Sequence, residues 1–209
     1  MRNRRELLAV ALCVVALAGI LVLTAGVSGE AARRAQCESN LKELFRAEQM
    51  YEETYGCMPP LYIAQRPSWI FWHSFIAPMV KDVRSFACPS DPRMSYLYEK
   101  SSPLFSGTVP LTSCYGMNRF MLEAGAKKAN ALEFKLKYLK EPSHTVVLMD
   151  SVRPFVTPDL LWADKRNFRH EGKANYVFGD GSVRYLGQEF FGEEVDGKFK
   201  TDLTRWHWR

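Results

Sequence analysis

The sequence predicts an α+β fold in which one long N-terminal helix packs on an antiparallel β-sheet. The first observation is an uncharged stretch, 7–29, that continues into a helical pattern of apolar and charged residues at 30–55. The second is a series of short alternating segments in the C-terminal half, two of them joined by the Asp-Gly typical of hairpins. The 180 residues from 30 to 209 suffice for one core. We therefore divide the chain into a basic N-terminus with a transmembrane helix, 1–29, and one head domain, 30–209.

The uncharged stretch has the length of a membrane-spanning helix. At about 1.5 Å per residue it reaches roughly 35 Å, enough to cross a hydrocarbon core of about 30 Å. Arg2, Arg4 and Arg5 precede it, and such positive charges favour a cytoplasmic N-terminus. We expect a single-pass inner-membrane protein with a periplasmic or extracellular head. A cleaved signal peptide is the alternative, although its apolar part is usually only about 7–15 residues long.

The residues from 30 to 55 form the amphipathic continuation of this helix. Apolar side chains recur at intervals of three, four or seven and define one face, whereas most charged residues fall elsewhere. Gly56 suits the position after a helix, and Pro59 and Pro60 prevent its continuation. The apolar face consists of Cys37, Leu41, Leu44, Phe45, Tyr51 and Tyr55.

The next eighty residues are less regular. An aromatic-rich segment, 61–80, predicts core packing around a short helix at 72–80, and a sugar-binding platform that includes Trp69 and Trp72 is the alternative. Proline and glycine recur through 88–118, which we interpret as loop.

Strands are predicted in the remainder. Alternating apolar residues indicate a strand at 132–138, and a short apolar run at 145–149 indicates a buried one that ends at Asp150. The segments 174–178 and 182–186 form the clearest hairpin, with its turn at Gly179, Asp180 and Gly181. An edge strand at 197–203 is a further expectation.

No enzyme is predicted. A hydrolytic set would draw on His144, Asp150, His170, Asp180 and Ser182, but no Gly-x-Ser-x-Gly elbow is present and we interpret these as turn residues and exposed polar side chains. The chain has no Cys-x-x-Cys pair and no His-Glu-x-x-His motif, so no metal or other cofactor is expected. A calcium site that includes Asp91 is left open.

Charge and cysteine content complete the analysis. Removing Arg2, Arg4, Arg5 and Glu6 from the total leaves 25 basic and 22 acidic residues, a net charge of +3 without a basic stripe, so nucleic-acid binding is not expected. In an exported head, one or two disulfides are expected, and four cysteines allow three full pairings. These cysteines are Cys37, Cys57, Cys88 and Cys114.

Several segments together resemble the type IV pilin-like proteins, in particular the group related to the major pseudopilin of type II secretion. Glu-Leu-Leu at 6–8 is similar to the start of a prepilin helix. The segment 169–183 resembles a closing Arg-His-x-Gly-x-Ala-Asn…Phe-x-Asp-Gly-His-Val block, with Ser182 in place of the histidine. The other matches are the segments 32–42, 86–91 and 113–118, the positions Tyr51, Tyr55-Gly56 and Pro59-Pro60, and Pro142-Ser143 with Asp150.

The resemblance implies a fold and a function. It implies a pilin-like fold and a structural subunit that assembles, with its own copies or other pilin-like subunits, through the N-terminal helix. In that family the early glutamate, here Glu6, pairs with a neighbouring subunit's N-terminal amine, which would avoid a costly unpaired carboxylate in the bilayer. Prepilins are processed and methylated ahead of Phe-Thr-Leu-Ile, whereas residues 2–5 here are Arg-Asn-Arg-Arg. A non-polymerising envelope protein whose aromatic head binds a ligand such as glycan is the alternative.

Overall fold

The computed structural model describes most of the chain. For some helix and strand residues the description covers the backbone but not the side chains, and these residues are 4–11, 18–28, 64–65, 68–69, 100–101, 108–109, 191–195 and 198–201. The described residues are 4–65, 68–91, 100–101, 108–109, 113–119, 134–157, 164–195 and 198–201.

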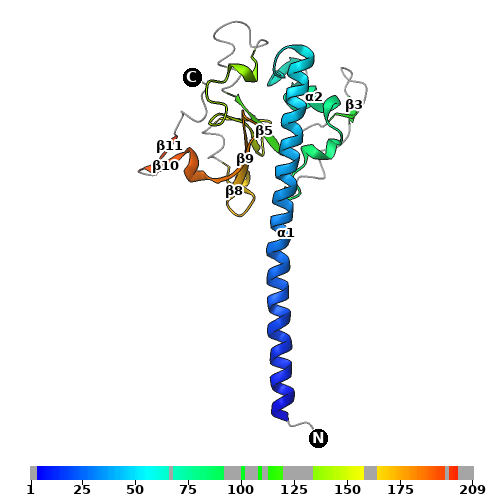
Figure 1. Ribbon diagram of the computed structural model, residues 1–209, viewed down its shortest axis with the longest axis vertical. Helices are drawn as coiled ribbons and strands as arrows, with labels where there is room; N and C mark the ends of the chain where they lie inside the picture. The colour runs from blue at the N-terminus through cyan, green and yellow to red at the C-terminus, as the bar shows by residue number, and fades with distance from the viewer. Residues whose placement is uncertain are drawn as a thin grey trace.

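One continuous helix, α1 (Arg4–Tyr55), organises the molecule and confirms the prediction of a single helix over both N-terminal segments. Its 52 residues span about 78 Å, and its first half projects from the head as a stalk (Figure 1). Among the residues with described side chains, no helix has both the length and the apolarity needed to cross a bilayer. Of the predicted anchor, the side chains of 7–11 and 18–28 lie outside the description.

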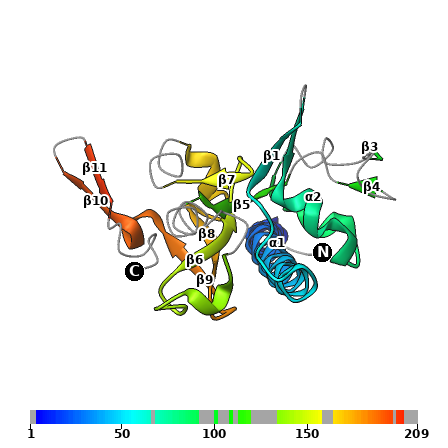
Figure 2. The ribbon, with the colours of Figure 1, turned by 90° about the horizontal axis from the view of Figure 1, so that it is seen from above.

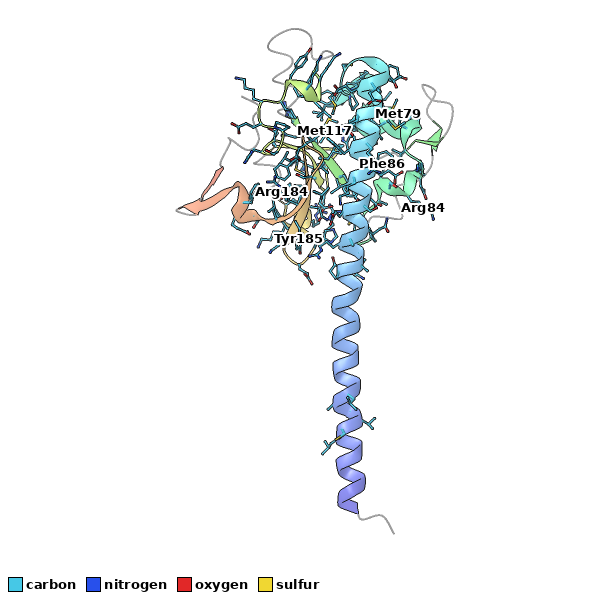
Figure 3. The ribbon with its side chains drawn as sticks, viewed as in Figure 1. Met79, Arg84, Phe86, Met117, Arg184 and Tyr185 are labelled. Carbon is cyan, nitrogen blue, oxygen red and sulfur yellow. The ribbon has the colours of Figure 1, made fainter. Side chains whose placement is uncertain are left out.

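The second half of α1 is embedded in the head. Cys37, Leu41, Leu44 and Phe45 are buried as predicted, and Figure 3 shows Phe86 and Met117 beside this part of the helix. Tyr55 was assigned to the same face, but it is 62% exposed because the helix extends past the core at its end.

Gly56 ends the helix as predicted. Its φ of +77° is the left-handed conformation that glycine adopts after a helix, and its N–H donates to the Glu52 carbonyl at 2.8 Å.

A five-stranded sheet in the order β7-β5-β6-β8-β9 packs against α1. Figure 2 shows α1 end-on, between this sheet and the region of α2 and β1. The prediction of an antiparallel sheet needs one correction, because β5 and β7 run parallel and the sheet is mixed. Its strands are β5 (Tyr115–Asn118), β6 (Val146–Asp150), β7 (Phe155–Val156), β8 (Lys173–Phe178) and β9 (Val183–Gly187).

The sheet separates two apolar clusters. Val147, Leu148 and Val177 belong to the main core with the buried face of α1, whereas Val146 and Met149 join a smaller cluster. All five residues of β6 are buried, which explains its continuous apolar sequence.

Short elements surround this framework. The helix predicted at 72–80 is present as α2 (Trp72–Ile76) followed by the 3-10 turn η1 (Ala77–Met79). The other hairpins are β1 (Tyr62–Gln65) with β2 (Ser68–Phe71), β3 (Lys100–Ser101) with β4 (Thr108–Val109), and β10 (Gly192–Val195) with β11 (Lys198–Thr201). The other 3-10 turns are η2 (Val83–Phe86), η5 (Leu136–Tyr138), η6 (Lys165–Phe168) and η7 (Gln188–Phe191).

The strand predicted at 132–138 is wrong over its described residues. These residues instead cross the end of α1, where the Phe134 carbonyl accepts from Met58 N–H and Leu136 N–H donates to the Glu52 carboxylate. The backbone therefore finds its partners at the helix terminus instead of in a sheet, and 136–138 form η5.

The interpretation of 88–118 as loop is also wrong for β3 and β4, which pair as a hairpin, and for β5, which is an inner strand of the five-stranded sheet. Gly116, one of the glycines of this segment, provides space for a neighbouring strand: a Cβ there would lie 2.5 Å from Val156 Cγ2 and 2.8 Å from the Arg153 carbonyl oxygen. The glycine lets β5 approach β7 closely.

The hairpin predicted at 174–186 is confirmed as β8 and β9, paired from Lys173–Gly187 to Val177–Val183. Gly181 has a φ of +80° and its N–H donates to the Phe178 carbonyl, as in a three-residue hairpin loop. The strand predicted at 197–203 exists as β11, but it pairs with β10 in a separate hairpin, and 202–203 lie outside the description.

Candidate functional site

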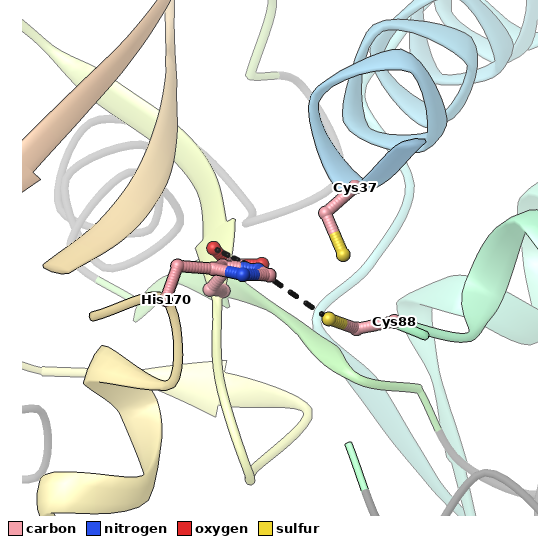
Figure 4. A group of neighbouring side chains, drawn as sticks. Cys37, Cys88 and His170 are labelled. Carbon is pink, nitrogen blue, oxygen red and sulfur yellow. Dashed lines mark hydrogen bonds and ion pairs between the residues drawn. The ribbon is translucent and has the colours of Figure 1, made fainter. Parts of the chain in front are cut away.

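Four side chains from distant parts of the chain meet inside the head. They are Cys37 on α1, Cys88 after η2, Asp150 at the end of β6 and His170 ahead of β8, and we call them the buried cluster. One nitrogen, sulfur or oxygen atom of each lies within 4.8 Å of the others, and all four residues are fully buried. Figure 4 shows the two sulfur atoms on the same side of the His170 ring.

The position of His170 is set by a tight backbone turn. His170 and Lys173 exchange both backbone hydrogen bonds, at 3.1 and 2.9 Å, across Glu171 and Gly172. These two central residues have φ values of +53° and +79°, the pattern of a type I′ turn. The Tyr185 hydroxyl also donates to the His170 carbonyl at 2.5 Å. The turn and this bond hold the imidazole in one place.

Both ring nitrogens of His170 have partners. Nε2 lies 3.5 Å from Cys88 Sγ and 3.6 Å from Asp150 Oδ2, and Nδ1 lies 2.7 Å from Glu30 Oε1. Glu30 also accepts from the Ser90 hydroxyl and from Arg33. The Glu30 carboxylate therefore favours a proton on Nδ1, and Nε2 is the nitrogen that faces the buried cluster.

Asp150 is only partly satisfied. Its Oδ2 accepts from the Asn175 backbone N–H at 2.6 Å. Its Oδ1 is buried and has no hydrogen-bond partner among the described residues. Burial raises the pKa of Asp150 to about 6, against the opposing charge of Arg169.

The two thiols and the imidazole shift each other's titration. The hydrogen bond from Cys37 lowers the pKa of Cys88 to about 5, although burial opposes this, and the same bond together with burial raises the pKa of Cys37. Burial lowers the pKa of His170, but Cys88, Asp150 and Glu30 outweigh it and raise that pKa to about 9. The arrangement favours a thiolate on Cys88 facing an imidazolium on His170.

A buried ion pair borders the cluster. Arg169 Nη1 donates to Asp91 Oδ2 at 2.5 Å, and Arg169 Nη2 donates to the Cys114 carbonyl at 3.3 Å. Asp91, considered above for calcium, is thus engaged by a guanidinium, which repels a cation.

The residues predicted from sequence have different outcomes. Asp180 accepts from Ser182 N–H and Oγ in the hairpin turn, and His144 is exposed, as expected. The interpretation of Asp150 and His170 as exposed side chains is wrong, because tertiary packing buries both completely, although His170 does open a turn.

Two predictions concern the cysteines and Glu6. Cys37, Cys57, Cys88 and Cys114 are all thiols in the structure, and disulfide formation stays a prediction. The side chain of Glu6 lies outside the description.

Sequence reasoning missed the buried cluster because it searched for metal ligands at short spacings. A signal was nevertheless present. Cys37, Cys88 and His170 each fall in a segment that carries the resemblance, and Asp150 ends a predicted buried strand. The tertiary fold was needed to bring them together.

The comparisons with known proteins give one partial match. Residues 29–82 match the model of a family described as "Protein of unknown function (DUF1559)", a family commonly associated with pilin-like and prepilin-type proteins. The match covers the second half of α1 through η1 and contains Cys37, but not Cys88, Asp150 or His170. Neither the curated proteins nor the solved structures yielded a match.

Proposed function

We propose that this protein is a pilin-like structural subunit of a type II secretion or type IV pilus-type assembly, anchored in the inner membrane by the first half of α1. Its N-terminus lies in the cytoplasm, its head lies in the periplasm or outside the cell, and it has no enzymatic role. We also propose that the head has a pilin-like fold and that the protein is related to the major pseudopilin of type II secretion.

The observation that carries the proposal is the projecting half of α1. Its described apolar side chains, Leu12, Val14, Val15 and Leu17, are 58–70% exposed and have no core of their own chain to cover them. A row of this kind needs an apolar environment from outside the chain, which a bilayer or the helices of neighbouring subunits supply. The partial match to a family commonly associated with pilin-like proteins agrees with this choice.

Crosslinking in cell envelopes tests the assembly. In a Cys13→Ser background, Val14→Cys places a thiol on the projecting half, and Met50→Cys places an exposed one on the half within the head. After treatment with a membrane-permeant oxidant, we expect covalent dimers from Val14→Cys and not from Met50→Cys. Monomers in both cases would contradict assembly through α1.

The alternative of a glycan-binding head receives less support from the described residues. Trp72, one of the two tryptophans considered for a sugar platform, is fully buried, and its Nε1 donates to the Pro154 carbonyl at 2.5 Å. It is therefore a core residue. The side chain of Trp69 lies outside the description.

A further inference from the structure

We propose that Cys37, Cys88, Asp150 and His170 bind one zinc ion that fastens α1 to the sheet of the head. This inference does not depend on the proposed function, because it concerns the interior of the head and not the projecting half of α1.

The spacing of the ligand atoms fits tetrahedral zinc. Zn–N and Zn–S bonds of about 2.0 and 2.3 Å at a tetrahedral angle separate nitrogen from sulfur by about 3.5 Å, and nitrogen from a carboxylate oxygen by about 3.4 Å. The corresponding distances from His170 Nε2 are 3.5 Å to Cys88 Sγ and 3.6 Å to Asp150 Oδ2. These two edges thus already have about the lengths expected in a coordination tetrahedron, and the ligand atoms of all four residues lie within 4.8 Å of one another.

The kinds of donor select the metal. Two thiolates with one imidazole and one carboxylate suit a borderline-soft dication, and zinc takes this combination in four-coordinate sites. Calcium and magnesium prefer oxygen donors throughout. Because four protein side chains complete the tetrahedron, no open position remains for substrate, and the role of the ion is structural.

The surrounding residues orient the ligands as outer partners of zinc sites do. The Nδ1–H of His170 donates to Glu30 Oε1, which leaves Nε2 as the ligand atom, and the Asn175 N–H holds Asp150 Oδ2. A carboxylate behind a histidine ligand is a recurrent arrangement in zinc proteins. Glu30 acts through His170 and is therefore a positioning residue.

The unsatisfied oxygen of Asp150 is an independent indication. A fully buried carboxylate oxygen with no hydrogen-bond partner in the described part of the head is costly unless a cation lies beside it. The guanidinium of Arg169 directs Nη1 to Asp91 and not to this oxygen. The positive charge of a dication in the buried cluster would offset the negative charges of the Asp150 carboxylate and of the two thiolates.

Binding involves no oxidation or reduction. Two protons leave to solvent as the two S–Zn bonds form, one from the Cys37 thiol and one from the Cys88–His170 pair, so that both sulfurs bind as thiolates and His170 binds as neutral imidazole. All four ligands are buried, so the ion enters as the head folds. The binding free energy of zinc is then added to the stability of the head.

A disulfide between Cys37 and Cys88 is the competing outcome. It would satisfy both sulfurs in an oxidising compartment, but it would remove two of the four ligands and leave the buried Asp150 carboxylate without a bound cation beside it. Zinc and the disulfide exclude each other, because both use the sulfur atoms of Cys37 and Cys88. Analysis of one preparation of the protein therefore shows which of the two is present.

The decisive experiment uses the full-length protein extracted from cell envelopes in detergent, without reductant or chelator. Mass spectrometry of the metals and mapping of non-reduced peptides are performed on the same sample. We expect about one zinc ion per chain and no Cys37–Cys88 disulfide. A quantitative disulfide without zinc would overturn the proposal.

A preparation that contains neither zinc nor the disulfide is titrated with Co²⁺. Tetrahedral thiolate ligation then gives intense visible bands and a sulfur-to-cobalt charge-transfer band, whose absence would also overturn the proposal. This measurement requires no variant and is independent of any folding defect.

Variants locate the site. Cys88→Ser and His170→Gln are expected to lose the bound zinc, whereas Cys114→Ser, which removes an equally buried cysteine outside the ligand set, should retain it. Glu30→Gln should weaken zinc affinity about 10–100-fold, measured by competition with a chromophoric chelator, with the cobalt spectrum preserved. Loss of zinc from Cys114→Ser together with retention in Cys88→Ser would contradict the assigned ligands.

Discussion

The two halves of α1 place their side chains in different surroundings. In the projecting half, the described apolar residues between Leu12 and Leu17 are exposed, whereas in the half within the head the polar residues Asn40 and Glu48 are buried. One uninterrupted helix joins them. Backbone conformation is therefore the same in both halves, and their difference lies in what surrounds each side chain.

The comparison also separates two kinds of buried polar residue. Asn40 donates to the Ala87 carbonyl at 2.9 Å and to the Tyr115 hydroxyl at 3.2 Å, and accepts from Gln36. Both carboxylate oxygens of Glu48 have no hydrogen-bond partner among the described residues. Asn40 therefore ties α1 to the head, whereas burial of Glu48 costs stability.

The largest expected effect is on apolar packing in the head. Leu41→Ala removes a fully buried side chain from the main core and should lower the free energy of unfolding by about 2–5 kcal/mol. Chemical denaturation in detergent, followed by tryptophan fluorescence, measures this. A change below about 0.5 kcal/mol would mean that α1 does not contribute to the core.

The next effect concerns the bridge that Asn40 makes. Asn40→Ala leaves the Ala87 carbonyl and the Tyr115 hydroxyl without this donor, and we expect a loss of about 1–3 kcal/mol. Gln36→Ala is the matched control, since Gln36 is exposed and its described bond is only to Asn40. Equal losses in the free energy of unfolding for the two substitutions would show that Asn40 makes no special contribution to stability.

Glu48 should behave in the opposite way. Replacing it with methionine removes two unsatisfied oxygens and should stabilise the head by about 1 kcal/mol at neutral pH. Burial raises the pKa of Glu48 well above its ordinary value. The carboxyl thus destabilises the native state progressively as pH rises above the unfolded-state pKa, and this penalty stops growing above the folded-state pKa.

The stabilisation by Glu48→Met should therefore be larger at pH 8 than at pH 4, when unfolding of both proteins is compared at each pH. A gain that is the same at both pH values would show that Glu48 finds a partner for its charge.

The smallest expected effect is in the projecting half of α1. Leu17→Ala makes the same chemical change as Leu41→Ala, but at an exposed position, so unfolding of the head in detergent should change by less than about 0.5 kcal/mol. A loss comparable with that of Leu41→Ala would mean that this half packs against the head of its own chain.

Local patterns predicted the parts of the fold that depend on neighbouring residues. The helix over both N-terminal segments, the short helix at Trp72, strand β6 and the β8–β9 hairpin follow from apolar periodicity, uninterrupted length and turn chemistry. These features act within a few residues, so the sequence displays them directly.

The missed features depend on tertiary contacts. Strand β5 was obscured because Gly116, which permits close approach of β7, is also a loop signal. The segment 134–138 belongs to a stretch that alternates like a strand, yet its backbone bonds to Met58 N–H, just past the end of α1, and to the Glu52 carboxylate on α1. The buried cluster combines residues from four segments, and no spacing along the chain predicts that convergence.

The central claim is that lipid surrounds the first half of α1 while protein surrounds the second. Alkaline extraction of cell envelopes, followed by protease treatment from the periplasmic side, tests it most directly. We predict that the full chain remains in the membrane pellet and that protease removes the head but leaves a fragment containing the residues up to about Gly29. Release of the intact protein into the alkaline supernatant, together with a soluble periplasmic control, would contradict the claim.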